Sequence, residues 1–276
     1  MTVLGAGRGP SMLEAVALSL DEMQFLLEKL EIDEVPVVLD AMGRYDNVVD
    51  HDAAMAAAAE SLTARELLAD DVVHHDLEVR LRALYRPHWV LAMRWYVADR
   101  VNRFCIAKGD DLEVVVLRGP DSYVVDEAGH DLPGTVMAAL GPADPLELSG
   151  MNALTEELEP IFNDAGDAAA TAERLNRVGK PARDAPVLAS AMVEIHSYAS
   201  IVGVVYGDGT RDIADGMIAV YDTRNGRFLA TTTRSDEDVQ WTSLASGTPT
   251  RLRQALKDLI DKLPLREDFK PSPPAV

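Results

Sequence analysis

Several short stretches contain residue types that carry chemistry in other proteins, and the first is glycine-rich. GAGRGP at 5–10 invites a nucleotide-binding interpretation. No strand-like segment precedes it, and Pro10 stands where a dinucleotide-binding loop needs its last glycine and the start of a helix. Gly179-Lys180 is followed by proline, which lacks the amide that a bound phosphate would need. The sequence therefore predicts no nucleotide cofactor.

Nucleophilic and metal-assisted catalysis also lack a complete set of residues. No serine lies in a G-x-S-x-G turn, and Cys105 lies between Phe104 and Ile106, where a buried, inert thiol is expected. The histidines never form H-E-x-x-H. Asp50-His51-Asp52 and His74-His75-Asp76 could hold a metal ion, but both fall at predicted helix starts, where Asp caps exposed amides. We favour capping and predict no catalytic residue, metal site or cofactor.

Acidic residues in loops could also bind calcium or act in acid–base catalysis. The acidic segment 208–215 lacks the glutamate at the twelfth position and the helices of a calcium-binding EF-hand. A pocket containing two carboxylates with separated pKa values would favour general acid–base catalysis. An enzyme with a cryptic acid/base pair stays as the less favoured alternative to a binding protein.

Composition limits the partners and the compartment. The chain has 276 residues, 47% of them hydrophobic, and a net charge of −20. That charge repels phosphate backbones and anionic lipids, so we expect neither nucleic-acid binding nor binding to a membrane surface. No apolar run is long enough to span a bilayer, and the N-terminus has no secretory signal. With a single cysteine, a cytoplasmic location is expected.

The elements that would position a binding site follow a repeated order of helices, four strands and one helix. Ser19 and Glu22 form a capping box, and Thr248 with Pro249 opens the last helix. Helical patterns are expected at 19–30, 51–69, 74–86, 133–140, 151–159, 167–178, 183–191 and 248–263. Extended segments are expected at 35–39, 88–97, 103–108, 112–118, 122–127, 192–206, 213–222, 227–234 and 239–244. Two similar α+β halves with antiparallel sheets are therefore predicted.

The predicted division of the chain follows this repeat. Residues 1–10 form a flexible lead, 11–145 the N-terminal half, 146–267 the C-terminal half, and 268–276 a disordered tail. The two halves together make one domain.

One hairpin is predicted with particular detail. Two apolar runs in MIAVYDTRNGRFLATTT (217–233) flank Asn225-Gly226, a dipeptide that accepts the positive φ angles of a two-residue type I′ turn. This hairpin more readily builds a docking surface than an active site, because no catalytic residues accompany it.

The same hairpin carries a resemblance to a known family. IAVYDTRNGRFLATTT followed by VQWTSLASGTPTRLRQALKDLIDKLP resembles the C-terminal signature of the EspG family of ESX (type VII) secretion-associated proteins. The matching positions are Asp222-Thr223, Gly226-Arg227, Trp241, Ser246–Pro249 and Leu263-Pro264. LRALYRPHWVLAMRWYV (81–97), ALGPADPLELSGMNALTEEL (139–158) and MVEIHSYAS (192–200) also look like family segments, so the resemblance covers about residues 15–267.

The resemblance implies a fold and a function. The family fold is a central antiparallel β-sheet flanked by two helical bundles, with two pseudo-twofold-related halves. Its members are cytoplasmic chaperones that bind the hydrophobic tip of a PPE protein in a PE–PPE heterodimer, keep it soluble and direct it to its secretion system. A regulatory or scaffold protein of the same fold without cargo binding is the alternative, and a homodimer that hides the empty groove is left open.

The resemblance also suggests where a partner would bind. The partner of family members docks against the central sheet and the C-terminal bundle. Apolar and aromatic residues of the predicted strands are the candidates for such a groove: Ile195, Tyr198, Ile218, Val220, Phe228, Ala230 and Trp241. The connection 98–103 is short where some family members carry a long loop, so partner choice must use other contacts.

Overall fold

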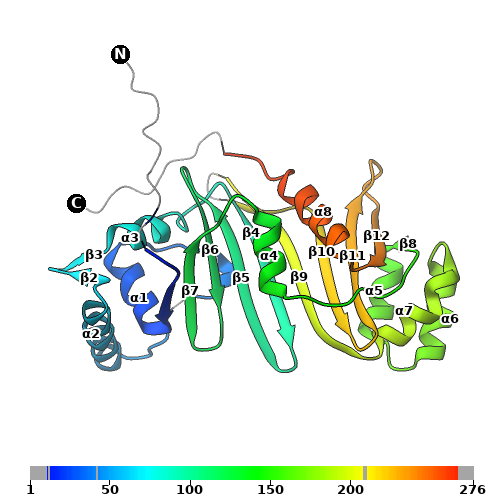
Figure 1. Ribbon diagram of the computed structural model, residues 1–276, viewed down its shortest axis with the longest axis horizontal. Helices are drawn as coiled ribbons and strands as arrows, with labels where there is room; N and C mark the ends of the chain where they lie inside the picture. The colour runs from blue at the N-terminus through cyan, green and yellow to red at the C-terminus, as the bar shows by residue number, and fades with distance from the viewer. Residues whose placement is uncertain (1–10, 12, 42, 208–209, 267–276) are drawn as a thin grey trace, which may run out of the picture.

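The computed structural model describes residues 11, 13–41, 43–207 and 210–266. The predicted lead at 1–10 and tail at 268–276 lie outside these residues. Ten strands form one antiparallel sheet in the order β1-β7-β6-β5-β4-β9-β10-β11-β12-β8 (Figure 1). The strands are β1 (Val16–Ser19), β4 (Trp89–Val97), β5 (Arg100–Lys108), β6 (Glu113–Arg118), β7 (Ser122–Glu127), β8 (Met151–Leu154), β9 (Ile195–Tyr206), β10 (Arg211–Thr223), β11 (Gly226–Arg234) and β12 (Gln240–Ser246). A separate pair, β2 (Leu68–Ala69) and β3 (Val72–Val73), makes a small ribbon.

The two halves of the chain repeat one plan. Each half begins with a short edge strand, continues through helices and a four-strand meander, and ends in one helix. The helices are α1 (Leu20–Lys29), α2 (Val48–Ala64), α3 (His75–Arg82) and α4 (Leu132–Leu140) in the first half, and α5 (Thr155–Asn163), α6 (Ala168–Val178), α7 (Ala185–Met192) and α8 (Pro249–Ile260) in the second. The halves meet where β4 pairs with β9. The predicted α+β fold with two related halves is confirmed.

The two faces of the sheet are covered differently. Helices α1–α3 lie at one end of the molecule and α5–α7 at the other, while α4 and α8 lie across the middle (Figure 1). Successive side chains of a strand point to opposite faces of the sheet, so the residues that contact each helix show which face that helix covers. Residues that pack with α1–α3, such as Val90, and residues that pack with α5–α7, such as Ala219, lie on one side, which we call the bundle face. Residues that pack with α4 and α8, such as Leu91 and Ile218, lie on the other, the α4/α8 face.

Helix caps hold the ends of these elements as their residue types predict. The Glu22 amide donates to the Ser19 hydroxyl oxygen at 3.0 Å, and the Ser19 amide donates to the Glu22 carboxylate at 2.7 Å. Thr248 caps α8 with Pro249 at its first position. Each capping interaction typically contributes about 1 kcal/mol. Both predicted helix starts are confirmed.

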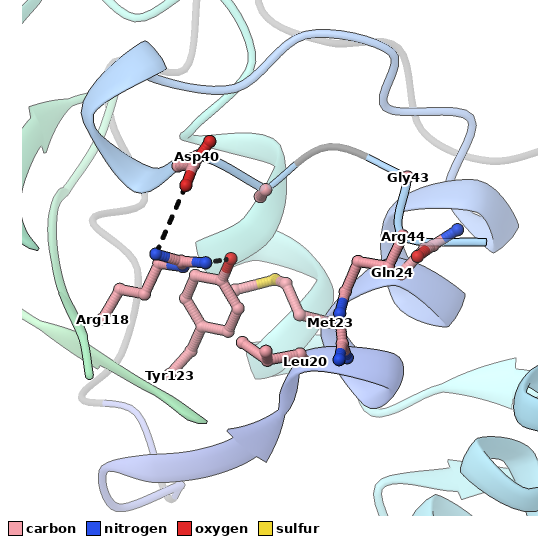
Figure 2. Close-up of a pocket in the computed structure, with 9 residues that line it drawn as sticks. Leu20, Met23, Gln24, Asp40, Gly43, Arg44, Arg118 and Tyr123 are labelled. Atoms are coloured by element: carbon pink, nitrogen blue, oxygen red, sulfur yellow. Dashed lines mark hydrogen bonds and ion pairs between the residues drawn. The ribbon is translucent and has the colours of Figure 1, made fainter. Parts of the chain in front are cut away.

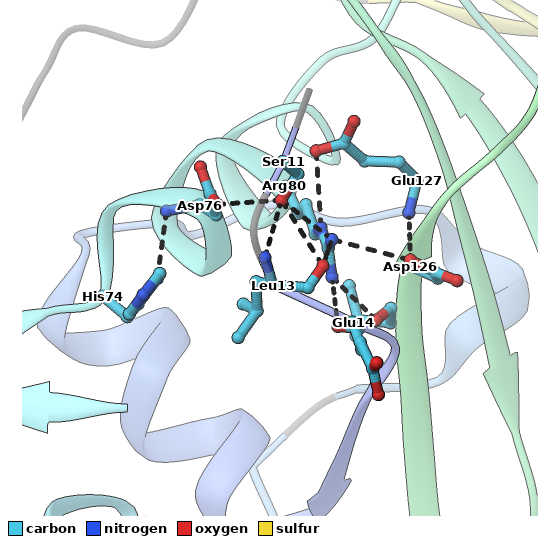
Figure 3. A network of polar contacts seen from close by, with 9 residues as sticks. Ser11, Leu13, Glu14, His74, Asp76, Arg80, Asp126 and Glu127 are labelled. Carbon is cyan, nitrogen blue, oxygen red and sulfur yellow. Dashed lines mark hydrogen bonds and ion pairs between the residues drawn. The ribbon is translucent and has the colours of Figure 1, made fainter. Parts of the chain in front are cut away.

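The N-terminal edge of the sheet is fixed by a buried cation. The Arg80 guanidinium, 1% exposed, donates to the carbonyl oxygens of Leu13 and Glu14 and lies 3.6 Å from carboxylate oxygens of Asp126 and Glu127 (Figure 3). A buried charge with several partners is costly to disrupt. Arg80 thereby ties the segment before β1 to the end of β7.

Four expectations about the elements differ from the structure. The segment 35–39 was expected to be extended, but Val37–Leu39 form a 3-10 helix after Pro36, because this turn buries Val38 and Leu39. Residues 151–154 were expected to be helical but form β8, which pairs with β12 and buries alternate side chains. The edge strand β1 was not predicted. Both strands missed in the large sheet are four residues long and pair with strands far along the chain. The small ribbon of β2 and β3 was also missed, because the helix expected to reach residue 69 ends at Ala64.

The predicted hairpin is confirmed, but its turn type is wrong. Thr223 pairs with Gly226, so the turn residues are Arg224 and Asn225, and neither has the positive φ angle of a type I′ turn. The Thr223 hydroxyl oxygen accepts from the Asn225 amide at 3.1 Å. Gly226 has φ of 125°, and a Cβ there would lie 2.7 Å from the backbone nitrogen of Leu146. The segment 141–150 between α4 and β8, which we call the linker, approaches so closely that glycine is required one position beyond the turn.

Candidate functional site

A row of aromatic side chains crosses four neighbouring strands on the bundle face. Strand pairing sets Tyr96 of β4 opposite Tyr198 of β9, Tyr198 opposite Tyr221 of β10, and Tyr221 opposite Phe228 of β11. Successive ring centroids lie 5.8, 5.0 and 4.6 Å apart. Opposed side chains of antiparallel strands are close enough for such stacking. We call these four residues the aromatic row.

The aromatic row passes from the core into solvent. Phe228 is fully buried beneath α5–α7, and Tyr221 is half-buried with Phe162 of α5 stacked on it at 5.2 Å. Tyr198 is also half-buried, while Tyr96 is 37% exposed. The row thus presents an apolar strip on the strands between the two sets of helices, near the ends of β4 and β10 and beside the C-terminal helices. Such exposed apolar surface is typical of a site for another macromolecule.

The environment of Tyr221 keeps its phenol neutral. Burial raises the pKa of Tyr221, and the neighbouring Tyr198 raises it further. A neutral phenol offers an apolar ring with one polar end, a combination that is common in protein interfaces. The row is therefore suited to packing against a partner rather than to proton transfer.

The seven residues proposed from sequence do not line one groove. Ile218 and Val220 are buried under α8 on the α4/α8 face, whereas Phe228 and Ala230 are buried on the bundle face. The reason is the pairing register: Val220 lies opposite Leu229, and Tyr221 opposite Phe228. The expectation of a single shared surface is therefore wrong.

The remaining three candidates are accessible but lie apart. Tyr198 belongs to the aromatic row. Ile195 is 36% exposed at the start of β9, and Trp241 is 44% exposed. Trp241 pairs with Thr233 and so belongs to the α4/α8 face, near the edge strand β8. Whether any of the seven contacts a partner stays a prediction.

Sequence reasoning missed Tyr96, Tyr221 and Phe162. A signal for Tyr221 was present in the hairpin itself. A two-residue turn makes odd-numbered residues of β10 share a face with even-numbered residues of β11, so Tyr221 and Phe228 had to lie on the same face. Tyr96 and Phe162 carried no such signal, because their contacts depend on pairing between the two halves and on helix docking.

The other chemical candidates have structural roles. Cys105 is fully buried, and this burial raises the pKa of its thiol to about 12, so the predicted buried thiol is confirmed. His51 lies in the first turn of α2, where Asn47 is the cap, and His74 caps α3 by accepting from the Asp76 amide. Among the described residues, no group of three or more His, Cys, Asp or Glu side chains is arranged to hold a metal ion.

The carboxyl groups with shifted pKa values are pushed toward the ionised form. Burial of Glu22 opposes ionisation, but hydrogen bonds from the Ser19 amide, Ser61 and Arg65 outweigh it and lower the pKa of Glu22. The ion-paired hydrogen bond from Arg253, together with the Gly134 amide, lowers the pKa of Asp131. A general acid at neutral pH needs the opposite shift. These groups are therefore capping and ion-pairing residues.

The central linker is attached beside the hairpin by one buried ion pair. The Arg227 guanidinium, 5% exposed, donates Nε to Asp222 Oδ1 at 2.5 Å and Nη2 to Asp222 Oδ2 at 2.9 Å. It also donates Nη1 to the Gly141 carbonyl oxygen at 3.0 Å. The Leu146 amide donates to the Arg227 carbonyl oxygen at 2.8 Å. Asp222 and Arg227 thus hold the linker that joins the halves.

The loop that follows Tyr96, between β4 and β5, is short. The connection between β4 and β5 was expected to be short, and it is a two-residue turn of Ala98 and Asp99, with Ala98 at φ of 53°.

No helix in the described part of the chain combines the length and apolar character needed to cross a bilayer.

Comparisons with known proteins identify the family of this chain. The structure is similar to that of "the Mycobacterium tuberculosis type VII secretion system chaperone EspG5 in complex with PE25-PPE41 dimer", with a TM-score of 0.74, 16% identity, and coverage of 93% of this chain and 99% of that one. At this identity the likeness shows the fold. The EspG family model matches residues 19–258, and the chain therefore belongs to the EspG family. The resemblance inferred from the motifs is confirmed.

Two curated relatives are also similar over nearly their whole length. One is the ESX-1 secretion-associated protein EspG1 of Mycobacterium tuberculosis (strain ATCC 25618 / H37Rv), 25% identical over 90% of this chain and 87% of the relative. The other is the ESX-1 secretion-associated protein EspG1 of Mycobacterium marinum (strain ATCC BAA-535 / M), 24% identical over 94% of this chain and 92% of the relative.

Proposed function

We propose that this protein is a cytoplasmic chaperone of type VII secretion. It binds the hydrophobic tip of a PPE protein in a PE–PPE heterodimer, keeps that tip soluble and directs the pair to its secretion system. Membership of the EspG family supports the secretion role, and the related EspG5 structure contains a PE25-PPE41 dimer. No covalent step or cofactor is needed, because the cargo has only to be bound and released.

The observation that carries the proposal is the partly exposed aromatic row beside the C-terminal bundle. Tyr96 and Tyr198 offer ring surface in the middle of the bundle face, where neither set of helices covers the sheet fully. Aromatic anchors of this kind supply most of the binding free energy in many interfaces. The net charge of −20 keeps such a surface soluble when it is empty.

Co-expression with candidate PE–PPE pairs, followed by size-exclusion chromatography, tests the proposal. We expect one pair to co-elute with the wild-type protein as a soluble ternary complex. Tyr198→Arg should abolish co-elution, because it places a charge in the half-buried centre of the row. Trp241→Arg on the α4/α8 face is the matched control and should leave the complex intact.

The outcomes separate the alternatives. If no PE–PPE pair co-elutes, cargo binding fails and a regulatory or scaffold role of the same fold is favoured. Loss of the complex with Trp241→Arg but not with Tyr198→Arg would move the docking surface to the α4/α8 face. Circular dichroism of each variant checks that it is folded.

A further inference from the structure

Three arginines lie next to one another on the bundle face. The first of them, Arg94, lies two residues before Tyr96 of the aromatic row on β4. Pairing sets Arg94 of β4 directly opposite Arg103 of β5, and Arg103 directly opposite Arg118 of β6. Arg94 precedes Tyr96 by two residues, so both project from the same face of β4. We call Arg94, Arg103 and Arg118 the arginine row.

The arginine row is short of negative partners. Asp40, at the end of the 3-10 helix, lies 3.3 Å from Arg103 and 3.5 Å from Arg118. Figure 2 shows Asp40 reaching Arg118, whose other side meets Tyr123. Arg94 is exposed, and in the part of the chain that the structure describes its side chain has no ion pair or hydrogen bond. In the described part of the chain, the Asp40 carboxylate thus pairs with two of the three guanidinium groups, and the third has no ion pair.

This arrangement costs stability in the free protein. Like charges directly opposite each other on paired strands are destabilising. The cost is unusual in a chain with 46 acidic residues against 26 basic ones, where a carboxylate could stand at almost any exposed position. The sequence instead concentrates positive charge in the middle of the sheet, where the bundle face is open at Tyr96.

The neighbouring strand β9 continues the surface formed by Arg94 and Tyr96 of β4. Arg94 lies opposite Ser200 of β9, while Tyr96 lies opposite Tyr198. The positive strip on β6, β5 and β4 therefore meets the apolar strip on β4, β9, β10 and β11 at strand β4, where the two halves join. A partner that covers Tyr96 must therefore also come close to Arg94.

We propose that the arginine row binds carboxylate groups of the docked protein partner, next to the apolar tip that the aromatic row binds. Arg94 supplies the free guanidinium for a bidentate contact with an Asp or Glu side chain. Arg103 and Arg118, already held by Asp40, add positive potential that attracts the acidic segment and orients it. This inference rests on the proposed function and specifies its cargo: a tip with acidic residues flanking its apolar ones.

Charge reversal at Arg94 tests the proposal on the PE–PPE pair that the wild-type protein binds. We expect Arg94→Glu to weaken binding about tenfold or more, with a smaller loss for Arg94→Gln. Added salt should weaken wild-type binding more than binding by Arg94→Glu, because salt screens the attraction that the variant lacks. Arg94→Gln should leave the melting temperature unchanged or raise it, since it relieves repulsion from Arg103.

Arg100→Glu is the matched control. Arg100 is also exposed and lies on β5, but strand alternation turns it to the α4/α8 face. We expect this variant to bind like the wild type. Equal affinity of Arg94→Glu and the wild type would overturn the arginine inference and leave the chaperone proposal standing. A wild-type protein that binds no PE–PPE pair would overturn both, and an equal loss with Arg100→Glu would reduce the effect to overall charge.

Discussion

At the scale of single residues, Glu22 links three elements through one carboxylate. It closes the capping box of α1 with Ser19, accepts from the Ser61 hydroxyl of α2 at 2.8 Å, and pairs with Arg65 at 2.9 Å. The residue is 4% exposed, so these partners replace the water that an ionised carboxylate would otherwise bind. Glu22 therefore contributes to stability only while it is ionised.

This dependence predicts a response to pH. The pKa of Glu22 is lowered from the ordinary 4.5, so its contribution is fully present above pH 4.5 and is lost as the pH falls through the folded-state pKa. We expect Glu22→Gln to reduce the free energy of unfolding at neutral pH by about 1–3 kcal/mol, and the difference from the wild type to shrink in acid. Chemical denaturation at several pH values measures both.

Glu60→Gln, at an exposed position of α2, serves as the control and should change neither stability nor its pH dependence noticeably. A pH-independent difference between Glu22→Gln and the wild type would contradict the assigned role of the charge.

At the scale of elements, the hairpin of β10 and β11 is the anchor for the linker between the halves. Gly226 admits the linker backbone, and the Arg227–Asp222 pair binds it through the Gly141 carbonyl oxygen. The positions of the family signature, Asp222-Thr223 and Gly226-Arg227, therefore have a structural explanation in this chain. They fix the linker and support the strands that carry the aromatic row.

Removal of Arg227 should destabilise the protein strongly. Arg227→Met leaves the Asp222 carboxylate and the carbonyl oxygens of Leu140 and Gly141 without their donor, and the expected loss is about 3–5 kcal/mol of unfolding free energy. Thermal and denaturant unfolding measure this change. Arg234→Met on the same strand removes an exposed ion pair with Asp238 and should cost at most about 1 kcal/mol. Similar losses in the two variants would refute the anchoring role.

At the scale of the whole molecule, two related halves place their helical bundles at opposite ends of one sheet face. The central strands β4 and β9 join the halves, so the middle of that face is the region that neither bundle covers fully. The other face is closed there by α4 and α8. The repeated plan thus creates one open surface, which carries the aromatic and arginine rows.

Much of this plan could be predicted from the sequence, because it depends on local patterns. The meanders follow from apolar, β-branched runs between turn residues, and the starts of α1 and α8 follow from Ser19 and Thr248. The strands β1 and β8 could not be recognised, since pairing with distant strands decides four-residue segments. The candidate groove failed for a related reason: Ile218 and Phe228 are similar in sequence character but lie on opposite faces.

Hydroxyl-radical footprinting of the tyrosine and tryptophan side chains tests the central claim most directly. It compares the free protein with its complex with a PE–PPE pair. Tyr96 and Trp241 are similarly exposed in the free chain, at 37% and 44%, but lie on opposite faces. We predict that the pair protects Tyr96 and Tyr198 from oxidation and leaves Trp241 unchanged. Protection of Trp241 with no change at Tyr96 would contradict docking on the bundle face.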